Sequence, residues 1–467
     1  MDKERRKKIQ TTKLVITEIF MLIIIVLTVV ILTFVVMGYH LNEDGKLEQS
    51  GLVQVESTPD GAAVIIDGEV LPNKTDTNKI LKEGEHTVKI EKDGYTSWQK
   101  TVSAHPGFLT KLSYPRLYKL DRKAEAVYTF ETVPDIFLTS PNRDVILTAN
   151  NNSPKLQLLN INSSSIRPAE IDLTKLLMDS TGEKTVLEWN KNGSRLILKF
   201  TKNDTPHFAV VDLEYPDRSL DLTSSFDVQI SDLHFLNDYG DRLFILENDH
   251  LRIISIADKQ ISGILVEDVK TFSNLGDKVL LVTKTNQLSL YDASSKSNLP
   301  LFTSSAEVVK PLLSEYIGRF TVALAEDNNI TVYRGDLPTE KTVNKEKPLG
   351  EPIGKYTLDF GTPQNFFMQA KNQIIVSQSD VNFAVFDLEN YSKSAFSLPV
   401  DLTFWPDEYT IGLVSDGVLS VYDFDGTNRI DLGKAEPGFP ASISKDNDYL
   451  YLIRKTEKLE LIRENIK

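Results

Sequence analysis

The stretch "PASISKDNDYLYLIRKTEKLELIRE", Pro440–Glu464, decides how the larger part of this chain is expected to close. It contains three short segments with the apolar pattern of β-strands, where comparable stretches upstream contain four. A last strand without a neighbour would expose an unpaired edge. The segment "AEAVYTF", Ala124–Phe130, alternates in the same way and precedes the first of those stretches. We therefore expect these two segments to pair and to close a ring of four-stranded units.

The unit recurs along residues 124–467. Each copy has a short strand, a turn rich in Gly, Asn or Asp, a strongly apolar strand, a polar turn and an alternating strand. The apolar strands begin about 44 residues apart on average, and four-stranded propeller blades repeat every ~40–50 residues. We expect an eight-bladed β-propeller, or seven blades if the irregular stretch 306–360 is not a unit. The eight apolar strands begin at Arg143, Ser194, Asp241, Asp277, Arg319, Asn372, Tyr409 and Asp448.

Aspartates close the third strand of many copies. Each is expected to start the turn into the outermost strand by bonding nearby backbone. "DFDGTN", 423–428, echoes a calcium loop but lacks the full loop and its terminal Glu, so no metal is expected there. "SPN" (140–142) and "NKNG" (190–193) resemble the turns of TolB-like and WD40-like propellers, a likeness of architecture alone. The aspartates are Asp212, Asp258, Asp292, Asp387 and Asp423.

A small β domain is predicted before the propeller. "GLVQVESTPDGAAVIIDGEV", 51–70, predicts a hairpin of strands 52–56 and 62–66, with Pro and Gly in its turns. "EGEHTVKIEKDGY", 83–95, predicts a further strand pair that turns at Asp93–Gly94.

These motifs resemble the PEGA domain family, a small all-β module of bacterial envelope proteins. The resemblance covers residues 51–120 and implies a spacer or binding module at a cell surface. The family often has Thr-Pro where this chain has Thr75–Asp76. Trp98 and Tyr95 are expected to be core aromatics. The motif residues, all expected to be structural, are Pro59, Asp60, Gly61, Ala62, Asp67, Gly68, Gly94 and Tyr95.

One segment has the composition of a membrane span. "IFMLIIIVLTVVILTFVVMGY", 19–39, has no charge and at about 1.5 Å per residue matches a hydrocarbon core of roughly 30 Å. We expect an uncleaved transmembrane helix over 14–39 and a linker over 40–50; a cleavable signal peptide is the alternative. The basic tail, 1–13, predicts a cytoplasmic N-terminus and an extracytoplasmic remainder. The tail residues that set this topology are Arg5, Arg6, Lys7, Lys8 and Lys13.

Charge and composition exclude several functions. The whole chain has a net charge of −14. The tail contributes +4 and Glu18 contributes −1, so residues 40–467 have a net charge of −17. A nucleic-acid partner is therefore not expected. The chain has no cysteine, its six histidines show no metal-binding spacing, and no nucleophile elbow or phosphate-binding loop is present. We accordingly expect no catalytic, cofactor-binding or metal-binding residues.

Two functions fit these observations. The first is a single-pass membrane protein of the cell envelope that is not an enzyme: a PEGA spacer presents a propeller that binds a glycan or an envelope protein. The second is an exported propeller-type glycan hydrolase or lyase, since a pair of catalytic carboxylates is a spatial relation that sequence does not show. Carboxylates that converge around a space for a sugar would favour the second.

Overall fold

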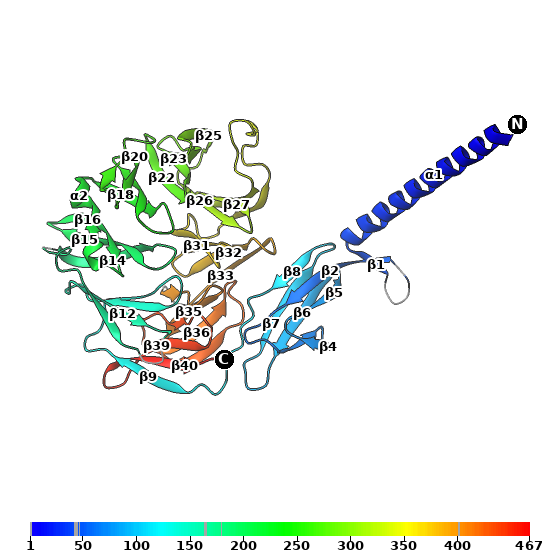
Figure 1. Ribbon diagram of the computed structural model, residues 1–467. Helices are drawn as coiled ribbons and strands as arrows, with labels where there is room; N and C mark the ends of the chain where they lie inside the picture. The colour runs from blue at the N-terminus through cyan, green and yellow to red at the C-terminus, as the bar shows by residue number, and fades with distance from the viewer. Residues whose placement is uncertain (1, 42–44, 46, 163–165, 179, 400–401) are drawn as a thin grey trace. The chain divides into compact units, whose positions relative to one another are not determined.

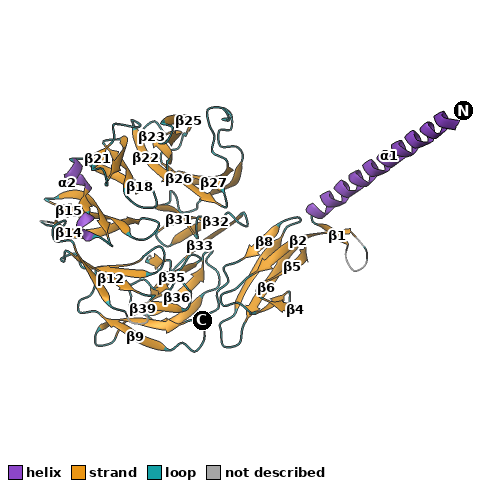
Figure 2. Ribbon diagram, in the orientation of Figure 1, coloured by secondary structure: helices purple, strands orange, loops and turns teal. Residues whose placement is uncertain are grey.

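The computed structural model describes residues 2–41, 45, 47–162, 166–178, 180–399 and 402–467. The chain forms two compact units, residues 1–118 and 119–467. Figure 1 shows the elements along the chain, and Figure 2 shows strands in both units and the long helix α1 near the N-terminus. This all-β architecture behind an N-terminal apolar helix confirms the expected fold class.

The long helix is α1, Asp2–Val36. Its stretch Lys13–Val36 is long and apolar enough to cross a bilayer, by length and composition. The apolar side chains of this stretch are exposed, as Leu22 at 63% illustrates. The helix ends at Val36, and Gly38 follows it with a φ of +81°, the left-handed conformation that glycine adopts readily just after a helix. The Gly38 amide donates to the Val35 carbonyl.

The β domain consists of two four-stranded sheets with a shared core. In that core Val53, Val55, Val64, Ile90 and Trp98 are fully buried. One sheet contains β1 (Tyr39–Leu41), β2 (Leu47–Val55), β5 (Thr77–Lys82) and β8 (Leu109–Leu112); the other contains β4 (Glu69–Lys74), β3 (Ala63–Ile66), β6 (Gly84–Glu91) and β7 (Trp98–Ala104).

One predicted hairpin of this domain is wrong. Strands β2 and β3 do not pair: β2 pairs with β1, β5 and β8, whereas β3 pairs with β4 and β6. The alternation of a strand identifies its buried face but not its partner, and here both buried faces meet across the core. The connection through Pro59 therefore crosses between sheets. The pair turned at Asp93–Gly94 is confirmed, since β6 and β7 are antiparallel neighbours.

The described residues of the second unit form eight four-stranded sheets, here called blades 1 to 8. Figure 1 labels many of their strands. Blade 1 is β10 (Ile136–Thr139), β11 (Val145–Ala149), β12 (Lys155–Asn160) and β13 (Pro168–Asp172); blade 2 is β14 (Ser180–Trp189), β15 (Arg195–Lys202), β16 (Thr205–Asp212) and β17 (Leu220–Asp221); blade 3 is β18 (Ile230–Phe235), β19 (Arg242–Glu247), β20 (His250–Ser255) and β21 (Gln260–Ile261); blade 4 is β22 (Val269–Leu275), β23 (Lys278–Thr283), β24 (Gln287–Asp292) and β25 (Ser297–Thr303).

Blade 5 is β26 (Val309–Tyr316), β27 (Arg319–Glu326), β28 (Asn329–Gly335) and β29 (Pro352–Thr357); blade 6 is β30 (Asn365–Gln369), β31 (Ile374–Ser379), β32 (Asn382–Asp387) and β33 (Ser392–Ser397); blade 7 is β34 (Thr403–Phe404), β35 (Thr410–Ser415), β36 (Val418–Asp423) and β37 (Ile430–Lys434); blade 8 is β38 (Ser442–Ile443), β39 (Tyr449–Lys455), β40 (Leu459–Asn465) and β9 (Ala124–Thr129). Blade 2 also carries the short helices η1 (Pro216–Arg218) and α2 (Leu222–Phe226). The irregular stretch 306–360 thus forms blade 5, and the seven-bladed alternative is wrong.

Burial explains the sequence pattern of the blades. The second strands are covered on both faces, so they read as continuous apolar runs; in β19, Leu243, Phe244, Ile245 and Leu246 are all buried. The outermost strands have one exposed face and alternate, as β25 does. The repeated pattern in the sequence therefore reflects how deeply each strand of a blade is buried.

The ring closes as predicted. Strand β9 pairs antiparallel with β40, with Leu461 opposite Tyr128. A core between blades 8 and 1 joins residues from both ends of the unit, among them Phe130, Phe137 and Tyr451. The Tyr451 hydroxyl donates to the Ile161 carbonyl at 2.6 Å across the same seam. Among the blades that the structure describes, blade 8 is thus the one assembled from two distant parts of the chain.

Candidate functional site

The closure of the ring creates a groove between blades 8 and 1, which we call the closure groove. It has a volume of about 600 Å³. Strand β9, the link 130–135 and the turn 150–154 between the second and third strands of blade 1 bring its residues together. Its main polar and aromatic lining residues are Tyr128, Glu131, Thr132, Asp135, Asn150, Asn152, Lys155, Gln157 and Glu170.

An aromatic pair forms one side of the closure groove. The rings of Tyr128 and Phe130 meet edge to face at 4.9 Å. Phe130 is only 5% exposed and packs into the core of the seam, whereas Tyr128 is half-buried and has access to the groove. The Tyr128 hydroxyl lies 3.4 Å from Oε1 of Gln157. Burial and the nearby carboxylates of Glu131 and Glu170 raise the pKa of Tyr128, so the phenol is neutral at physiological pH.

The turn 150–154 is held by Lys184 of blade 2, which is only 4% exposed. Its ammonium donates to the carbonyl oxygens of Asn150 and Asn151, and its amide donates to Oδ1 of Asn151 at 3.0 Å. Burial lowers the pKa of Lys184. On the other side, the Asn151 amide donates to Oδ2 of Asp135 at 2.7 Å. The turn is therefore held in place before any ligand arrives.

Polar groups remain available at the rim of the closure groove. Within the described part of the chain, the side chains of Glu131 and Asn152 form no hydrogen bond or ion pair, and both are exposed. Lys155 pairs with Glu170 at 2.8 Å. With Asp135 the lining carries three carboxylates and one ammonium, which disfavours anionic ligands. A half-buried aromatic ring beside unpaired amide and carboxylate groups suits a neutral polyhydroxylated ligand.

A second groove occupies the corresponding position between blades 2 and 3. It has a volume of about 1040 Å³ and is bounded by the link 227–229 and the turn 247–249. Ser, His and Asp side chains meet here: Nδ1 of His207 lies 3.0 Å from Oδ2 of Asp221, and the Ser224 hydroxyl donates to Asp221 at 2.7 Å. Ser224 and Asp221 both approach the same ring nitrogen, whereas a catalytic triad uses both nitrogens. Asp221 also caps α2 through the Ser224 amide, so this cluster is structural.

The inner strands of blades 2 and 3 carry a second ionisable cluster. Nδ1 of His234 on β18 lies 2.8 Å from Oε2 of Glu188 on β14, and Asp232 lies on the other side of the ring at 3.6 Å. Burial disfavours the imidazolium, but the bond to Glu188 and the charges of both carboxylates outweigh it and raise the pKa of His234. Burial raises the pKa of Asp232.

A smaller cavity of about 300 Å³ lies among the first turns of blades 1, 6 and 7. Its carboxylates have partners: Glu408 pairs with Lys371 at 3.2 Å, and Asp407 accepts from the amides of Tyr409 and Thr410. Trp405 lines this cavity but meets Phe367 edge to face. This cavity has carboxylates near an aromatic ring, yet both are already engaged: Asp407 holds its own turn, and Glu408 pairs with a lysine of blade 6.

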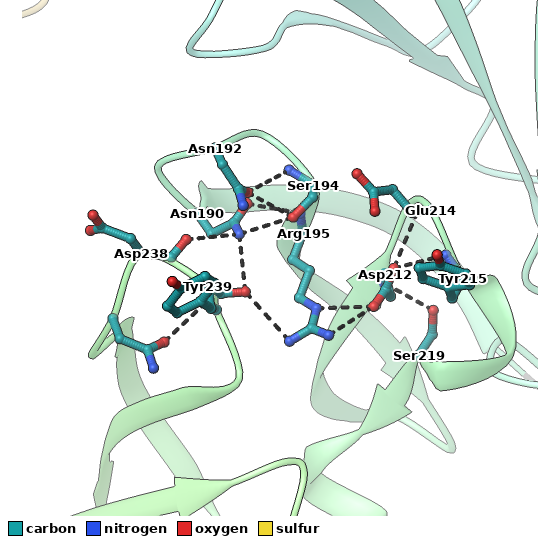
Figure 3. A network of polar contacts seen from close by, with 12 residues as sticks. Asn190, Asn192, Ser194, Arg195, Asp212, Glu214, Tyr215, Ser219, Asp238 and Tyr239 are labelled. Atoms are coloured by element: carbon teal, nitrogen blue, oxygen red, sulfur yellow. Dashed lines mark hydrogen bonds and ion pairs between the residues drawn. The ribbon is translucent and has the colours of Figure 1, made fainter.

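The aspartates at the ends of the third strands have the predicted structural role in blades 2, 4 and 6. Figure 3 shows Asp212, which accepts from the amide of Tyr215 at 2.8 Å and from the Arg195 guanidinium at 3.0 Å. Arg195 also reaches the Tyr239 carbonyl of blade 3. Asp292 and Asp387 likewise accept from amides of the turns that follow them. Asp258 differs, because its carboxylate accepts at 2.7 Å from the hydroxyl of Ser255, a residue that precedes it in the chain.

The calcium-like loop of blade 7 is filled by its own side chains. Asp423 accepts from Nδ2 of Asn428 at 2.8 Å, and Asp425 accepts from the Thr427 hydroxyl at 2.6 Å. Asp423 and Asp425 are both buried. Among the described residues, no cluster of three acidic or histidine side chains is arranged to hold a metal ion.

The predicted motif residues of the β domain occupy turns. Asp67 and Gly68 form the β3–β4 turn, and Asp67 accepts from the Thr87 amide and from Nδ1 of His86 at 2.6 Å. The His86 bond lowers the pKa of Asp67. Pro59 and Ala62 are buried, Asp60 and Gly61 lie between them, and Gly94 turns β6 into β7. No described motif residue lines the closure groove.

Two further predictions concern single residues. Trp98 is a core residue, whereas Tyr95 is half-buried in a turn with the Lys92 ammonium over its ring, so its predicted place in the core is wrong. Lys13 lies on α1. The side chains of Arg5, Arg6, Lys7 and Lys8 are outside the described part of the structure.

The sequence did not reveal the closure groove. "AEAVYTF" identified the closing strand but not that Tyr128 faces a cavity. The run Asn150–Asn152 marks a turn of blade 1, but Asn is common in turns, so the run does not distinguish this turn from those of the other blades.

Comparison with known proteins agrees with the division of the chain. The family model of the PEGA domain matches residues 50–116, so this chain contains a PEGA domain. The second unit is of the β-propeller class. No curated sequence is significantly similar to the chain.

Three solved structures illustrate the likeness of the propeller. The β-propeller domain of Cps50 (Swd1) from Myceliophteria thermophila is 11% identical, with 66% of this chain and 98% of that chain covered and a TM-score of 0.41. An oligogalacturonate lyase in complex with manganese is 9% identical, with 74% and 98% covered and a TM-score of 0.40. The designed Ika8 protein is 12% identical, with 72% and 98% covered and a TM-score of 0.41. Likenesses this distant concern the fold and carry no functional argument.

Proposed function

We propose that this protein is a membrane-anchored, extracytoplasmic binding protein of the cell envelope, and that its propeller recognises a neutral glycan in the closure groove. In this proposal α1 is an uncleaved single span with a cytoplasmic N-terminus, and the PEGA domain is a spacer between membrane and propeller. The observation that carries the proposal is the closure groove itself: a half-buried tyrosine lies beside a fixed turn, and the rim has polar groups with no partner among the residues that the structure describes.

The carboxylates of the closure groove support binding of a glycan rather than its hydrolysis. A glycosidase needs two carboxyl groups with distinct roles. Here Asp135 accepts from the Asn151 amide and Glu170 is paired with Lys155, which leaves Glu131 as the carboxylate without a described partner. Sugar hydroxyls can bond Glu131 and Asn152, and the apolar face of a sugar ring can stack on Tyr128.

The test is binding of the full chain, in lipid nanodiscs, to a panel of neutral and anionic glycans and to isolated cell-wall polymer at physiological salt. The polymer is then analysed for chain length. Retention of a neutral glycan with its length unchanged is the expected result. Shortened polymer would overturn the proposal in favour of a hydrolase or lyase, and retention of none of the glycans would overturn it in favour of a protein partner.

A further inference from the structure

The outer face of one PEGA sheet carries an apolar patch that is exposed. Leu109 on β8, Leu52 on β2 and Ile80 on β5 are neighbours in one row across three strands. Their outward orientation follows from the alternation, because Val53, Val55 and Leu112 are buried in the core. Phe108, which precedes β8, is 59% exposed, Ile80 is 55% exposed and Leu109 is 39% exposed. We call Phe108, Leu109, Leu52 and Ile80 the juxtamembrane patch.

This patch begins next to the end of α1. The Ser50 amide donates to the Gly38 carbonyl at 2.9 Å, and the Gly107 amide donates to the Ser50 carbonyl at 3.1 Å. A Cβ atom on Gly38 would lie 2.4 Å from the Gly107 nitrogen, and one on Gly107 would lie 2.8 Å from the Val36 carbonyl oxygen. Only glycines allow this approach of backbones. Phe108 therefore follows directly on a residue that contacts the last turn of the apolar helix.

With α1 spanning the bilayer as proposed above, simple distances put the patch within the reach of the lipid headgroups. A bilayer has an interfacial layer of roughly 5–8 Å on each side of its hydrocarbon core. A strand rises about 3.4 Å per residue, so Leu52 lies roughly 7 Å beyond Ser50, which is bonded to the helix end. The helix end also has an aromatic pair, Phe34 and Tyr39, with ring centres 5.2 Å apart. Tyrosine is one of the residues enriched at the membrane interface.

We propose that the juxtamembrane patch inserts into the headgroup–acyl boundary of the bilayer that α1 spans, so that the PEGA domain lies on the membrane with this sheet face down. The proposal rests on the membrane-anchored function proposed above. Insertion is apolar rather than electrostatic, since the patch has no charge and the adjoining Lys82 is paired with Glu48 at 3.1 Å. It removes from water the exposed side chains of Phe108, Leu109 and Ile80 and the remaining accessible surface of the half-buried Leu52.

The absence of cysteine from the chain allows a direct test. Single variants Phe108→Cys and Ile80→Cys of the full chain are spin-labelled in nanodiscs of neutral phosphatidylcholine. Collision rates are measured with oxygen, which partitions into lipid, and with a water-soluble nickel complex. Val70→Cys is the matched control, because Val70 is 62% exposed in the same domain but lies on the other sheet. Ile25→Cys reports on the span itself.

The expected result is an oxygen-to-nickel collision ratio several-fold higher at 108 and 80 than at 70, and highest at 25. Ratios at 108 and 80 equal to that at 70, with a high ratio at 25, would overturn the insertion and leave the anchor intact. A low ratio at 25 would overturn the anchor and the insertion together. Protection of 108 and 80 from both reagents would show that protein covers the patch, which also contradicts insertion into lipid.

Discussion

The groove between blades 8 and 1 and the groove between blades 2 and 3 lie at corresponding positions of the repeat, but different side chains line them. Each is bounded by the link between two blades and by a turn of the following blade. In the second groove His207, Asp221 and Ser224 bond one another. In the closure groove Glu131 and Asn152 have no partner among the described residues. Exposed polar side chains such as Gln229 and Asn248 also line the larger groove, but none of its described lining residues is Phe, Tyr or Trp, whereas Tyr128 lines the closure groove. The difference teaches that cavity volume is a poor guide to function, because the smaller groove is the one that offers an aromatic surface.

The largest effect expected from this comparison concerns two phenylalanines of equal burial. Phe130 and Phe208 are each 5% exposed, in the cores of the two seams. Replacement of either by Ala should lower the free energy of unfolding by about 3–5 kcal/mol, because each leaves a cavity in a packed core. Only Phe130→Ala should also weaken glycan binding, since Phe130 supports Tyr128. Denaturant unfolding and glycan affinity measure the two effects, and equal loss of affinity in Phe208→Ala would contradict the assignment.

A smaller effect on glycan affinity is expected from replacing the basic side chain that holds a turn beside each groove. Lys184→Met removes the ammonium that fixes the turn of the closure groove and should raise the Kd for glycan about tenfold, ~1.4 kcal/mol, because the turn is no longer held before binding. Arg252 is the matched residue, since its guanidinium holds Glu247 of the other groove at 2.7 Å. Arg252→Met should leave the Kd unchanged. A titration in which both variants lose the same affinity would show that the effect is general destabilisation.

The smallest effect concerns pH and the seam of blades 2 and 3. The folded-state pKa of His234 is raised above the ordinary value of 6.5, so its pairing with Glu188 stabilises fully below about pH 6.5 and is lost as pH rises through the folded-state pKa. The effect is modest because the His234 side chain is 39% exposed. His234→Gln and Glu188→Gln should both flatten this decline in thermal-unfolding scans across neutral pH. An unchanged decline in either variant would be evidence against the pairing.

These comparisons also separate what the sequence could predict from what it could not. The blade pattern was readable because strands covered on both faces must be apolar throughout, as β19 is. The closing strand was readable because an open edge needs a partner. The partners of β2 could not be predicted, because the alternation of a strand carries no information about which other strand pairs with it. The closure groove was not readable either: Tyr128 and Asn152 are 24 residues apart in the sequence, and only the folded seam brings them to one cavity.

The most direct test of the central claim is the affinity of the full chain for the glycan that it retains best, measured by titration calorimetry on two matched pairs of variants. Tyr128→Ala and Glu131→Ala change the closure groove; His207→Ala and Gln229→Ala change the groove between blades 2 and 3. The account predicts that the first pair lowers affinity by about tenfold or more, ~1.4 kcal/mol each, and that the second pair leaves it unchanged. Loss of affinity in the second pair, with the first pair unaffected, would contradict it.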